Sequence, residues 1–250
     1  FTCLGGAQAN GIFVKDTFGD ILADRIGLPV LNLSVGGGGA GFYLQAPALL
    51  DLVNGGRFTI VQVMTARTEP NARFGPYGFV EALWDIQNGQ QISTMEAWMN
   101  IFNEERALAP TYVAQSQENW VRRYQELAGE IHVPKILFYF SDKDPAEPID
   151  YEASDMMSII GRFPQFVDLA SLDAIRPLFD AYAQCGSTRN YGYPLVSRFT
   201  GEPVEVDGGT MAAYAAGMKW STNHYYPSPE MHEDAADALA DAVSRFSPAR

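Results

Sequence analysis

The first eleven residues constrain the fold of this chain more than any other stretch. Phe1–Gly11 reads FTCLGGAQANG, an apolar run that turns at two glycines and continues with small and amide side chains. A strand that ends in glycines and passes into a helix places backbone N–H groups at the carboxyl end of a sheet, where open α/β sheets bind their ligands. The stretch therefore predicts where a site forms and leaves its chemistry open.

Short β-rich runs alternate with helical patterns along the rest of the chain. This alternation predicts an α/β fold with a mostly parallel sheet. With 250 residues and 47% hydrophobic content, we expect a single domain over residues 1–250, with an irregular and helical insertion around 65–131 that includes a long irregular stretch, Thr65–Gln91. The expected strands are Phe1–Leu4, Val30–Leu33, Phe58–Met64 and Pro134–Phe140, with a short β segment at Val196–Val206. The expected helices are Val14–Ile26, Ala40–Val53, Thr94–Leu108, Ala114–Ile131, Leu172–Ala183 and Glu230–Phe246.

The charge balance excludes some partners. Thirty acidic residues against 17 basic ones give a net charge of −13, which argues against nucleic acid and against anionic membrane surfaces. No stretch reaches the ~18 apolar residues of a membrane helix, so we expect no membrane insertion. The two cysteines, Cys3 and Cys185, are too few for a disulfide framework or a zinc site, and Cys3 is expected to be a buried, inert thiol.

We expect no cofactor and no metal. Because the chain begins with Phe1 and not with methionine, a preceding segment is an open alternative, and the compartment stays undetermined. The oligomeric state is also undetermined by the sequence.

Four elements lie at or just after strand ends, namely Gly5–Gly11, Asn32–Gly39, Thr65–Arg67 and Tyr225–His232. Their order and spacing resemble the SGNH/GDSL hydrolase-like fold. That resemblance implies a three-layer α/β/α sandwich with a flavodoxin-like sheet, and a site built from these four elements. The whole sequence is also similar to an uncharacterised bacterial family with the same glycine turns and the same Tyr-Pro-Ser-Pro-Glu-Met-His ending.

The motifs of the resembled fold match only in part. Its first block, Gly-Asp-Ser-x-x-x-Gly, keeps its glycines here, but Ala7 stands at the position of the nucleophilic serine. The second block, Asn-x-Gly/Ser-x-x-Gly, matches Asn32–Gly37. The third, Gly-x-Asn-Asp, falls on Met64–Arg67 without its asparagine, and the last, Asp-x-x-His, falls on Pro229–His232 with the histidine alone.

The missing hydroxyl at Ala7 leaves three interpretations open. The protein has lost hydrolysis and kept a binding pocket; or the substrate supplies the nucleophile of a transfer reaction; or Ala7 is an engineered serine knockout, against which the absent asparagine and aspartate argue. In each case the N–H groups of Ala7 and Gly37 can still point at a shared oxygen.

Six residues are the candidates for the site. His232 is the predicted catalytic residue, as a general base or hydrogen-bond donor, and the alternative is a helix-start histidine packed on Tyr225 or Tyr226. Arg67 either clamps a sulfate, phosphate or carboxylate, or forms a salt bridge with Glu69 or another acid of the long loop. The other candidates for substrate or oxyanion binding are Ala7, Gln8, Ser34 and Gly37.

These observations support three hypotheses about function. The first is an SGNH-like protein with an anion- or ester-binding pocket that catalyses group transfer or hydrolysis on an esterified or sulfated surface carbohydrate. The second is a catalytically inactive carbohydrate-binding module on the same fold. The third is nucleotide binding at the Gly36–Gly39 turn, although this turn lacks the lysine of a phosphate loop. The expected partner is a small-molecule or carbohydrate ligand.

Overall fold

Strand β1 (Thr2–Leu4) lies inside a parallel sheet and brings the first glycine turn to the carboxyl edge of that sheet. The computed structural model describes residues 1–77, 80–207 and 217–246. Within them, five strands pair in the order β2-β1-β3-β7-β8, and every pairing is parallel. This is the flavodoxin-like order, so the predicted fold class is confirmed. The bounds are β2 Leu31–Asn32, β3 Thr59–Gln62, β7 Lys135–Phe140 and β8 Ala181–Cys185.

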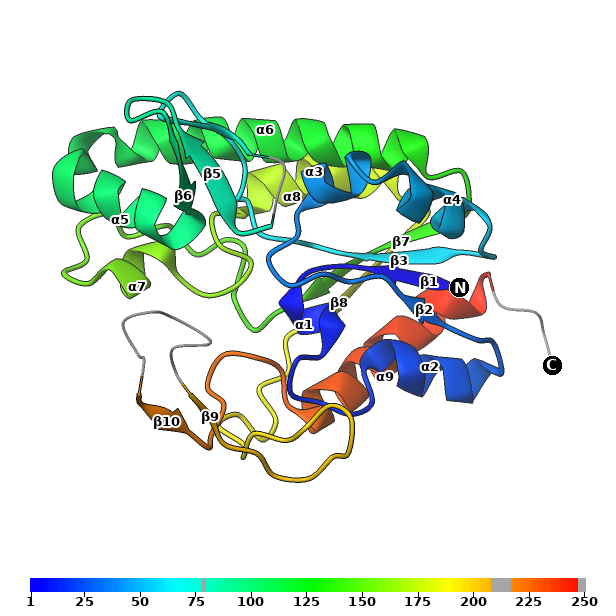
Figure 1. Ribbon diagram of the computed structural model, residues 1–250. Helices are drawn as coiled ribbons and strands as arrows, with labels where there is room; N and C mark the ends of the chain where they lie inside the picture. Colours follow the sequence, from blue (N-terminus) through cyan, green and yellow to red (C-terminus); the bar gives the residue numbers. More distant parts are fainter. Residues whose placement is uncertain (78–79, 208–216, 247–250) are drawn as a thin grey trace.

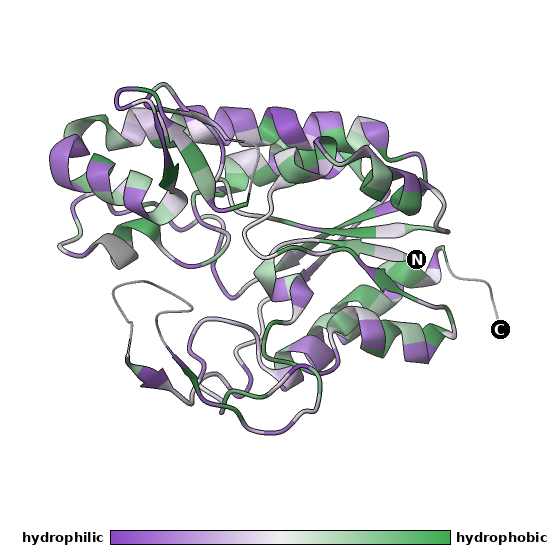
Figure 2. Ribbon diagram, in the orientation of Figure 1, coloured by the Kyte–Doolittle hydropathy of each residue, from purple (hydrophilic) through white to green (hydrophobic). Residues whose placement is uncertain are grey.

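Helices cover both faces of this sheet and complete the three layers (Figure 1). One face packs against α2 and α9, and the other against α3, α4, α6 and α8. Figure 2 shows the sheet as mostly hydrophobic and the outward face of α6 as hydrophilic, the pattern expected of a helix packed on a core. The bounds are α2 Phe18–Ile26, α3 Ala40–Leu44, α4 Pro47–Asn54, α6 Ala109–Glu130, α8 Leu169–Ile175 and α9 Pro229–Ser244. Among the described residues, no helix is both long and apolar enough to cross a membrane.

Side-chain caps determine where helices α2 and α9 begin. Thr17 caps α2 in a capping box with Asp20. Ser228 caps α9 by accepting a 3.0 Å hydrogen bond from the N–H of Met231. These caps satisfy N–H groups that the first helical turn leaves without partners. As a result His232 lies in the first turn of α9.

Several expected helices are wrong in their extent. The helix expected from Val14 begins at Phe18, and the one expected from Ala114 begins at Ala109. The helix expected over Ala40–Val53 is broken, because Pro47 has no N–H to continue α3 and starts α4 as its first residue. The helix expected over Leu172–Ala183 ends early: α8 stops at Ile175, and Pro177 follows. The N–H of Asp180 then donates to the carbonyl of Lys135 at 2.9 Å, which starts strand β8 beside β7.

The chain between β3 and β7 holds a small antiparallel sheet where a long irregular stretch was expected. That expectation is wrong for β4, β5 and β6, which pair in this order. A buried ion pair of 2.5 Å between Arg73 and Asp85 fastens β5, and it holds the pKa of Asp85 at about 2. Gly78 and Phe79 lie outside the described residues. The bounds are β4 Phe74–Pro76, β5 Ala82–Asp85, β6 Gln90–Ser93 and, after them, α5 Thr94–Glu104.

Candidate functional site

The two glycine turns lie side by side at the carboxyl ends of β1 and β2. The N–H of Val35 donates to the carbonyl of Gly5 at 3.0 Å, and the side chain of Asn10 donates to the carbonyl of Ser34 at 2.6 Å. These bonds join turns that are about thirty residues apart in the sequence. The structure therefore brings Ser34 close to the short helix α1 (Ala7–Asn10), which carries Ala7 and Gln8.

Buried polar side chains hold the first turn in place. The hydroxyl of Tyr43 accepts a 3.0 Å hydrogen bond from the N–H of Gly5, and Oε1 of Gln62 accepts one of 3.0 Å from the N–H of Gly6. A Cβ atom at Gly5 would lie only 2.6 Å from that same Oε1, so no larger residue fits there. Burial raises the pKa of Tyr43, which keeps its hydroxyl protonated.

Glu81 covers the second turn and ties it to Arg67. Its Oε1 accepts a 2.5 Å hydrogen bond from Nη2 of Arg67. Arg67 therefore forms a salt bridge with an acid of the long loop, which was one of the two alternatives expected for it. A Cβ atom at Gly37 would lie 2.2 Å from Cγ of Glu81. Gly37 has a φ of 74°, in the left-handed region that favours glycine. The turn thus needs glycine both for its conformation and for close approach.

The predicted oxyanion donors keep free N–H groups. Within the described residues, no group accepts a hydrogen bond from the N–H of Ala7 or of Gly37. Oγ of Ser34 and Nε of Arg67 are buried and also without partners in the part of the chain that the structure describes. Ala7 and Gly36 are in contact range, since a Cβ at Gly36 would lie 3.8 Å from that of Ala7.

His232 is completely buried and packs between two phenylalanine rings. Its Nδ1 accepts a 3.1 Å hydrogen bond from the N–H of Phe18, so the neutral ring carries its proton on Nε2. Burial lowers its pKa to about 3. The ring is stacked on Phe18 at 6.0 Å and lies edge-on to Phe140 at 5.3 Å, not on Tyr225 or Tyr226 as the packing alternative expected. This geometry offers an N–H donor and gives no support to a general base.

A pocket rich in aromatic rings opens next to Gln8 at the carboxyl ends of β1 and β7. We call it the aromatic pocket; the hollow is open to solvent and encloses about 540 Å³ of space. Gln8 is 4% exposed, and its Oε1 has no hydrogen-bond partner among the described residues. Burial raises the pKa of Tyr226 to about 12, and the charges of Glu81 and Arg67 also act on this phenol. Its lining includes Gln8, Phe140, Phe163, Tyr191, Tyr225 and Tyr226.

Gln165 is part of this region and was missed by the sequence analysis. Its Nε2 donates to the hydroxyl of Tyr225 at 3.0 Å, and its backbone carbonyl accepts from the N–H of Ala66 at 3.0 Å. Its Oε1 is buried and has no partner in the described part of the chain. No motif marks Gln165, which comes close to β3 only through the fold. Glu81 was missed for the same reason.

The described residues hold no cluster of three or more histidine, cysteine or acidic side chains suited to a metal ion. Cys3 and Cys185 are both buried and free, and burial raises the pKa of each thiol. The expectation of a buried, inert Cys3 is therefore confirmed.

Comparison with known proteins finds one family that matches part of the chain and several solved structures that are distantly similar to it. Residues 1–75 match a family described as a domain of unknown function, DUF6473. No curated protein matches. Among solved structures, the chain is similar to TesA at 12% identity and a TM-score of 0.45, with 98% of both chains covered. It is similar to the acetyl xylan esterase AlAXEase at 9% identity and a TM-score of 0.46, covering 97% of this chain and 100% of that one.

A further likeness is to an acetyl xylan esterase from the rumen bacterium Butyrivibrio proteoclasticus, at 10% identity and a TM-score of 0.44. It covers 98% of this chain and 63% of that one. At these identities and TM-scores the likenesses carry no inference about activity or substrate. The fold assignment rests on the strand order and the three layers.

Proposed function

We propose that this chain binds a hydroxyl-rich ligand, a carbohydrate, in the aromatic pocket and does not cleave esters with a nucleophile of its own. The observation that carries the proposal is the buried amide of Gln8, whose Oε1 lacks a partner among the described residues at the wall of an aromatic-lined pocket. A buried polar atom without a partner is costly, and a ligand hydroxyl would satisfy it.

The walls of the aromatic pocket suit the body of a sugar. Tyr225 is 43% exposed and Tyr191 is 58% exposed, so both rings are accessible to a ligand. Aromatic faces offer large apolar contact area, and Tyr225 adds a hydroxyl that Gln165 already orients. The charged residues of the lining, Arg162 and Asp142, pair with each other at 2.6 Å, which leaves little net charge to favour an anion. This balance favours a neutral ligand.

The site lacks two groups that ester hydrolysis needs, a nucleophile and a base. Ala7 has no nucleophilic atom, and His232 carries its proton on Nε2 and has a pKa of about 3. A serine-type mechanism needs both a hydroxyl and a base to accept its proton. The nucleotide hypothesis also loses support, because the side chain of Glu81 occupies the space over Gly37 that a phosphate would need.

A glycan array, followed by titration of each hit, tests the proposal. We expect binding that is lost in Gln8→Ala and Tyr225→Ala and kept in Gln91→Ala, an exposed amide of β6 that does not line the pocket. Tyr225→Phe should keep part of the affinity, because it retains the ring and loses only the hydroxyl. Binding that survives both Gln8→Ala and Tyr225→Ala would refute the proposal.

Group transfer is a second candidate, in which a hydroxyl of the ligand attacks an acyl or sulfuryl donor. The new C–O or S–O bond replaces the donor's bond to its leaving group, which departs with the proton of the hydroxyl. The N–H groups of Ala7 and Gly37, which lack acceptors in the described residues, favour it because they can stabilise a developing oxyanion. To separate binding alone from group transfer, the protein is incubated with a bound glycan and an acyl or sulfuryl donor, and the mass of the glycan is measured by mass spectrometry. A donor-dependent mass gain that appears with the folded protein and not with the heat-unfolded protein would favour transfer.

A further inference from the structure

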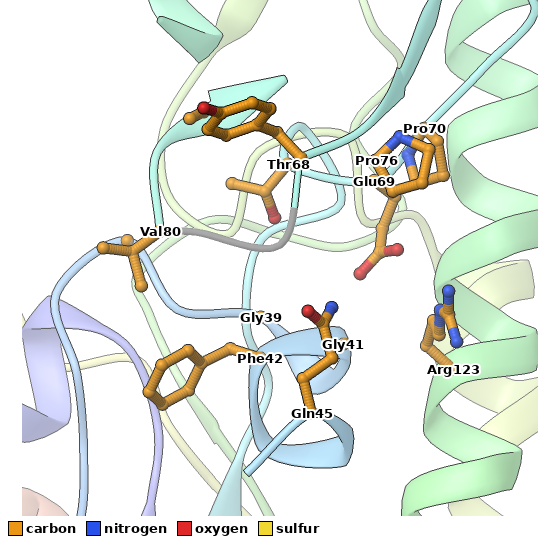
Figure 3. A pocket seen from close by; sticks show the side chains of 13 residues that line it. Gly39, Gly41, Phe42, Gln45, Thr68, Glu69, Pro70, Pro76, Val80 and Arg123 are labelled. Atoms are coloured by element: carbon orange, nitrogen blue, oxygen red, sulfur yellow. The ribbon is translucent and has the colours of Figure 1, made fainter. Parts of the chain in front are cut away.

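A second hollow of about 460 Å³ lies over the glycine segment that contains Gly37, Gly39 and Gly41 (Figure 3). We call it the glycine-floored pocket. Its chemistry differs from that of the aromatic pocket, because a buried carboxyl group and a hydroxyl group dominate it. Its lining includes Gly39, Phe42, Gln45, Thr68, Glu69 and Arg123.

Two side-chain oxygens converge directly over Gly39. A Cβ atom at this position would lie 3.1 Å from Oγ1 of Thr68 and 3.4 Å from Oε1 of Glu69. Figure 3 shows the carboxylate of Glu69, the hydroxyl of Thr68 and the amide of Gln45 pointing into the same hollow. Because glycine leaves the space above the backbone open, a small ligand can lie against the floor and reach both oxygens.

The segment that carries Glu69 is fixed to α6. Oγ of Ser116 donates to the carbonyl of Glu69 at 3.0 Å, and the side chain of Asn119 donates to the carbonyl of Pro70 at 2.8 Å. Glu69 is therefore held in position by bonds to its own backbone and that of its neighbour. A rigidly held polar group is what a binding site needs.

The carboxylate of Glu69 has no partner of its own. Glu69 is only 4% exposed, and among the described residues none donates a hydrogen bond to the carboxylate or lies within ion-pair distance of it. Arg123 approaches the pocket, but its Nη1 pairs with Glu126 at 2.9 Å. Oγ1 of Thr68 is also buried without a partner in the described part of the chain. A carboxylate on a residue that is only 4% exposed and a buried hydroxyl, both without donors, suit a ligand that supplies them.

We propose that the glycine-floored pocket binds a small ligand with a primary amine on a hydroxyl-bearing chain. The ammonium lies against the carboxylate of Glu69, and a hydroxyl of the ligand meets Thr68 and Gln45. The carboxylate disfavours anionic ligands, and the rings of Phe42 and Tyr77 contact the carbon chain. The proposal is independent of carbohydrate binding in the aromatic pocket.

The binding has a distinct pH dependence. Burial raises the pKa of Glu69 to about 7; Arg123 and Arg122 lower it and Glu126 raises it. The other titratable groups beside Glu69 are Tyr124 of α6, whose pKa burial raises, and Tyr77 of the pocket wall. The ionised fraction of Glu69 grows about tenfold between pH 6 and pH 8, while an alkyl ammonium stays charged. Affinity for the amine therefore rises about tenfold over this range.

Ligand-observed NMR with D-glucamine tests the proposal, with D-sorbitol as the neutral analogue of the same chain length. We expect D-glucamine to bind at least tenfold more tightly than D-sorbitol at pH 8, and this preference to fall about tenfold at pH 6. Equal binding of the two probes at pH 8, or no binding of D-glucamine, would overturn the proposal.

Three variants assign the effect to this pocket. Glu69→Gln keeps the shape and removes the charge, and should abolish the preference for D-glucamine at pH 8. Thr68→Val should weaken binding several-fold and leave the pH dependence intact, which keeps the test decisive if Glu69→Gln does not fold. Glu130→Gln changes the net charge equally at an exposed position of α6 and should have no effect. A preference for D-glucamine that persists in folded Glu69→Gln would refute the assignment.

Discussion

The backbone N–H of Phe18 donates a 3.1 Å hydrogen bond to Nδ1 of His232 and so joins the first turns of α2 and α9. The bond links residues 214 positions apart and fixes the tautomer of the ring. Because His232 is fully buried between Phe18 and Phe140, its neutral form is strongly favoured. The histidine that the motif comparison singled out is thus part of the packing between two helices.

The first prediction concerns acid stability. The pKa of His232 falls from 6.5 to about 3 on folding, so between these values the unfolded chain binds a proton that the folded chain does not. Stability is therefore full above pH 6.5 and is lost as the pH falls below it, by about 2 kcal/mol at pH 5. Urea unfolding of the parent and of His232→Gln at pH 8 and pH 5 measures this difference.

His132→Asn is the matched control, because His132 is exposed. It should keep the full loss of stability between pH 8 and pH 5, whereas His232→Gln should lose about 2 kcal/mol less than the parent over the same range. If parent and His232→Gln lose the same free energy on acidification, the buried neutral imidazole is not the cause.

The second prediction concerns the position of the missing nucleophile. Ala7→Ser should not raise hydrolysis of p-nitrophenyl acetate above that of the parent, because the introduced hydroxyl meets no base: Nε2 of His232 carries the proton and Nδ1 is occupied. Mass spectrometry of the protein after incubation checks for an acetylated intermediate. A burst of p-nitrophenolate stoichiometric with the protein would show that the parent geometry is a dormant hydrolase.

The third prediction concerns the ion pair that fastens the small antiparallel sheet. Asp85 is fully buried and accepts from Nη1 of Arg73 at 2.5 Å. Asp85→Asn leaves the Arg73 charge with only Glu105 and should cost about 2–4 kcal/mol in urea unfolding at pH 7. Asp51→Asn, at an exposed position of α4, should change stability by less than about 0.5 kcal/mol.

The same pair gives a pH dependence of known sign. The pKa of Asp85 is lowered from 3.8 to about 2 in the folded chain, so its contribution is present above pH 4 and is lost as the pH falls toward 2. The parent should therefore lose stability in this range and Asp85→Asn should lose less. Equal losses would contradict the pairing of Asp85 with Arg73.

The sequence predicts the central part of the fold because the buried strands are apolar and the turns carry glycines. It misplaces β8, since the segment Ala181–Cys185 has two alanines and a glutamine and lies half exposed at the sheet edge. An edge strand with weak β propensity reads as the continuation of the preceding helix, and only pairing with β7 makes it extended.

The sequence predicts the place of the candidate site better than its chemistry. The glycines at Gly5 and Gly37 mark the two turns, and these do lie together. The partners that decide their use are distant in sequence: Gln62 on Gly6, Glu81 on Gly37 and Phe18 on His232. Contacts of this kind depend on the order of the strands in the sheet, and no local sequence pattern predicts them.

The last prediction separates the two reasons for glycine at position 37. Gly37 and Gly89 both have left-handed φ angles, of 74° and 65°, but a Cβ at Gly89 would meet nothing within 4 Å, whereas one at Gly37 would lie 2.2 Å from Glu81. Gly89→Ala should cost about 1–2 kcal/mol for the backbone alone, and Gly37→Ala should cost more. Adding Glu81→Ala to Gly37→Ala should remove the excess, because the clash disappears and the backbone strain stays. Urea unfolding of Gly89→Ala, Gly37→Ala, Glu81→Ala and the double variant measures the coupling free energy between positions 37 and 81. If the free-energy costs of Gly37→Ala and Glu81→Ala simply add in the double variant, Glu81 does not cover the turn.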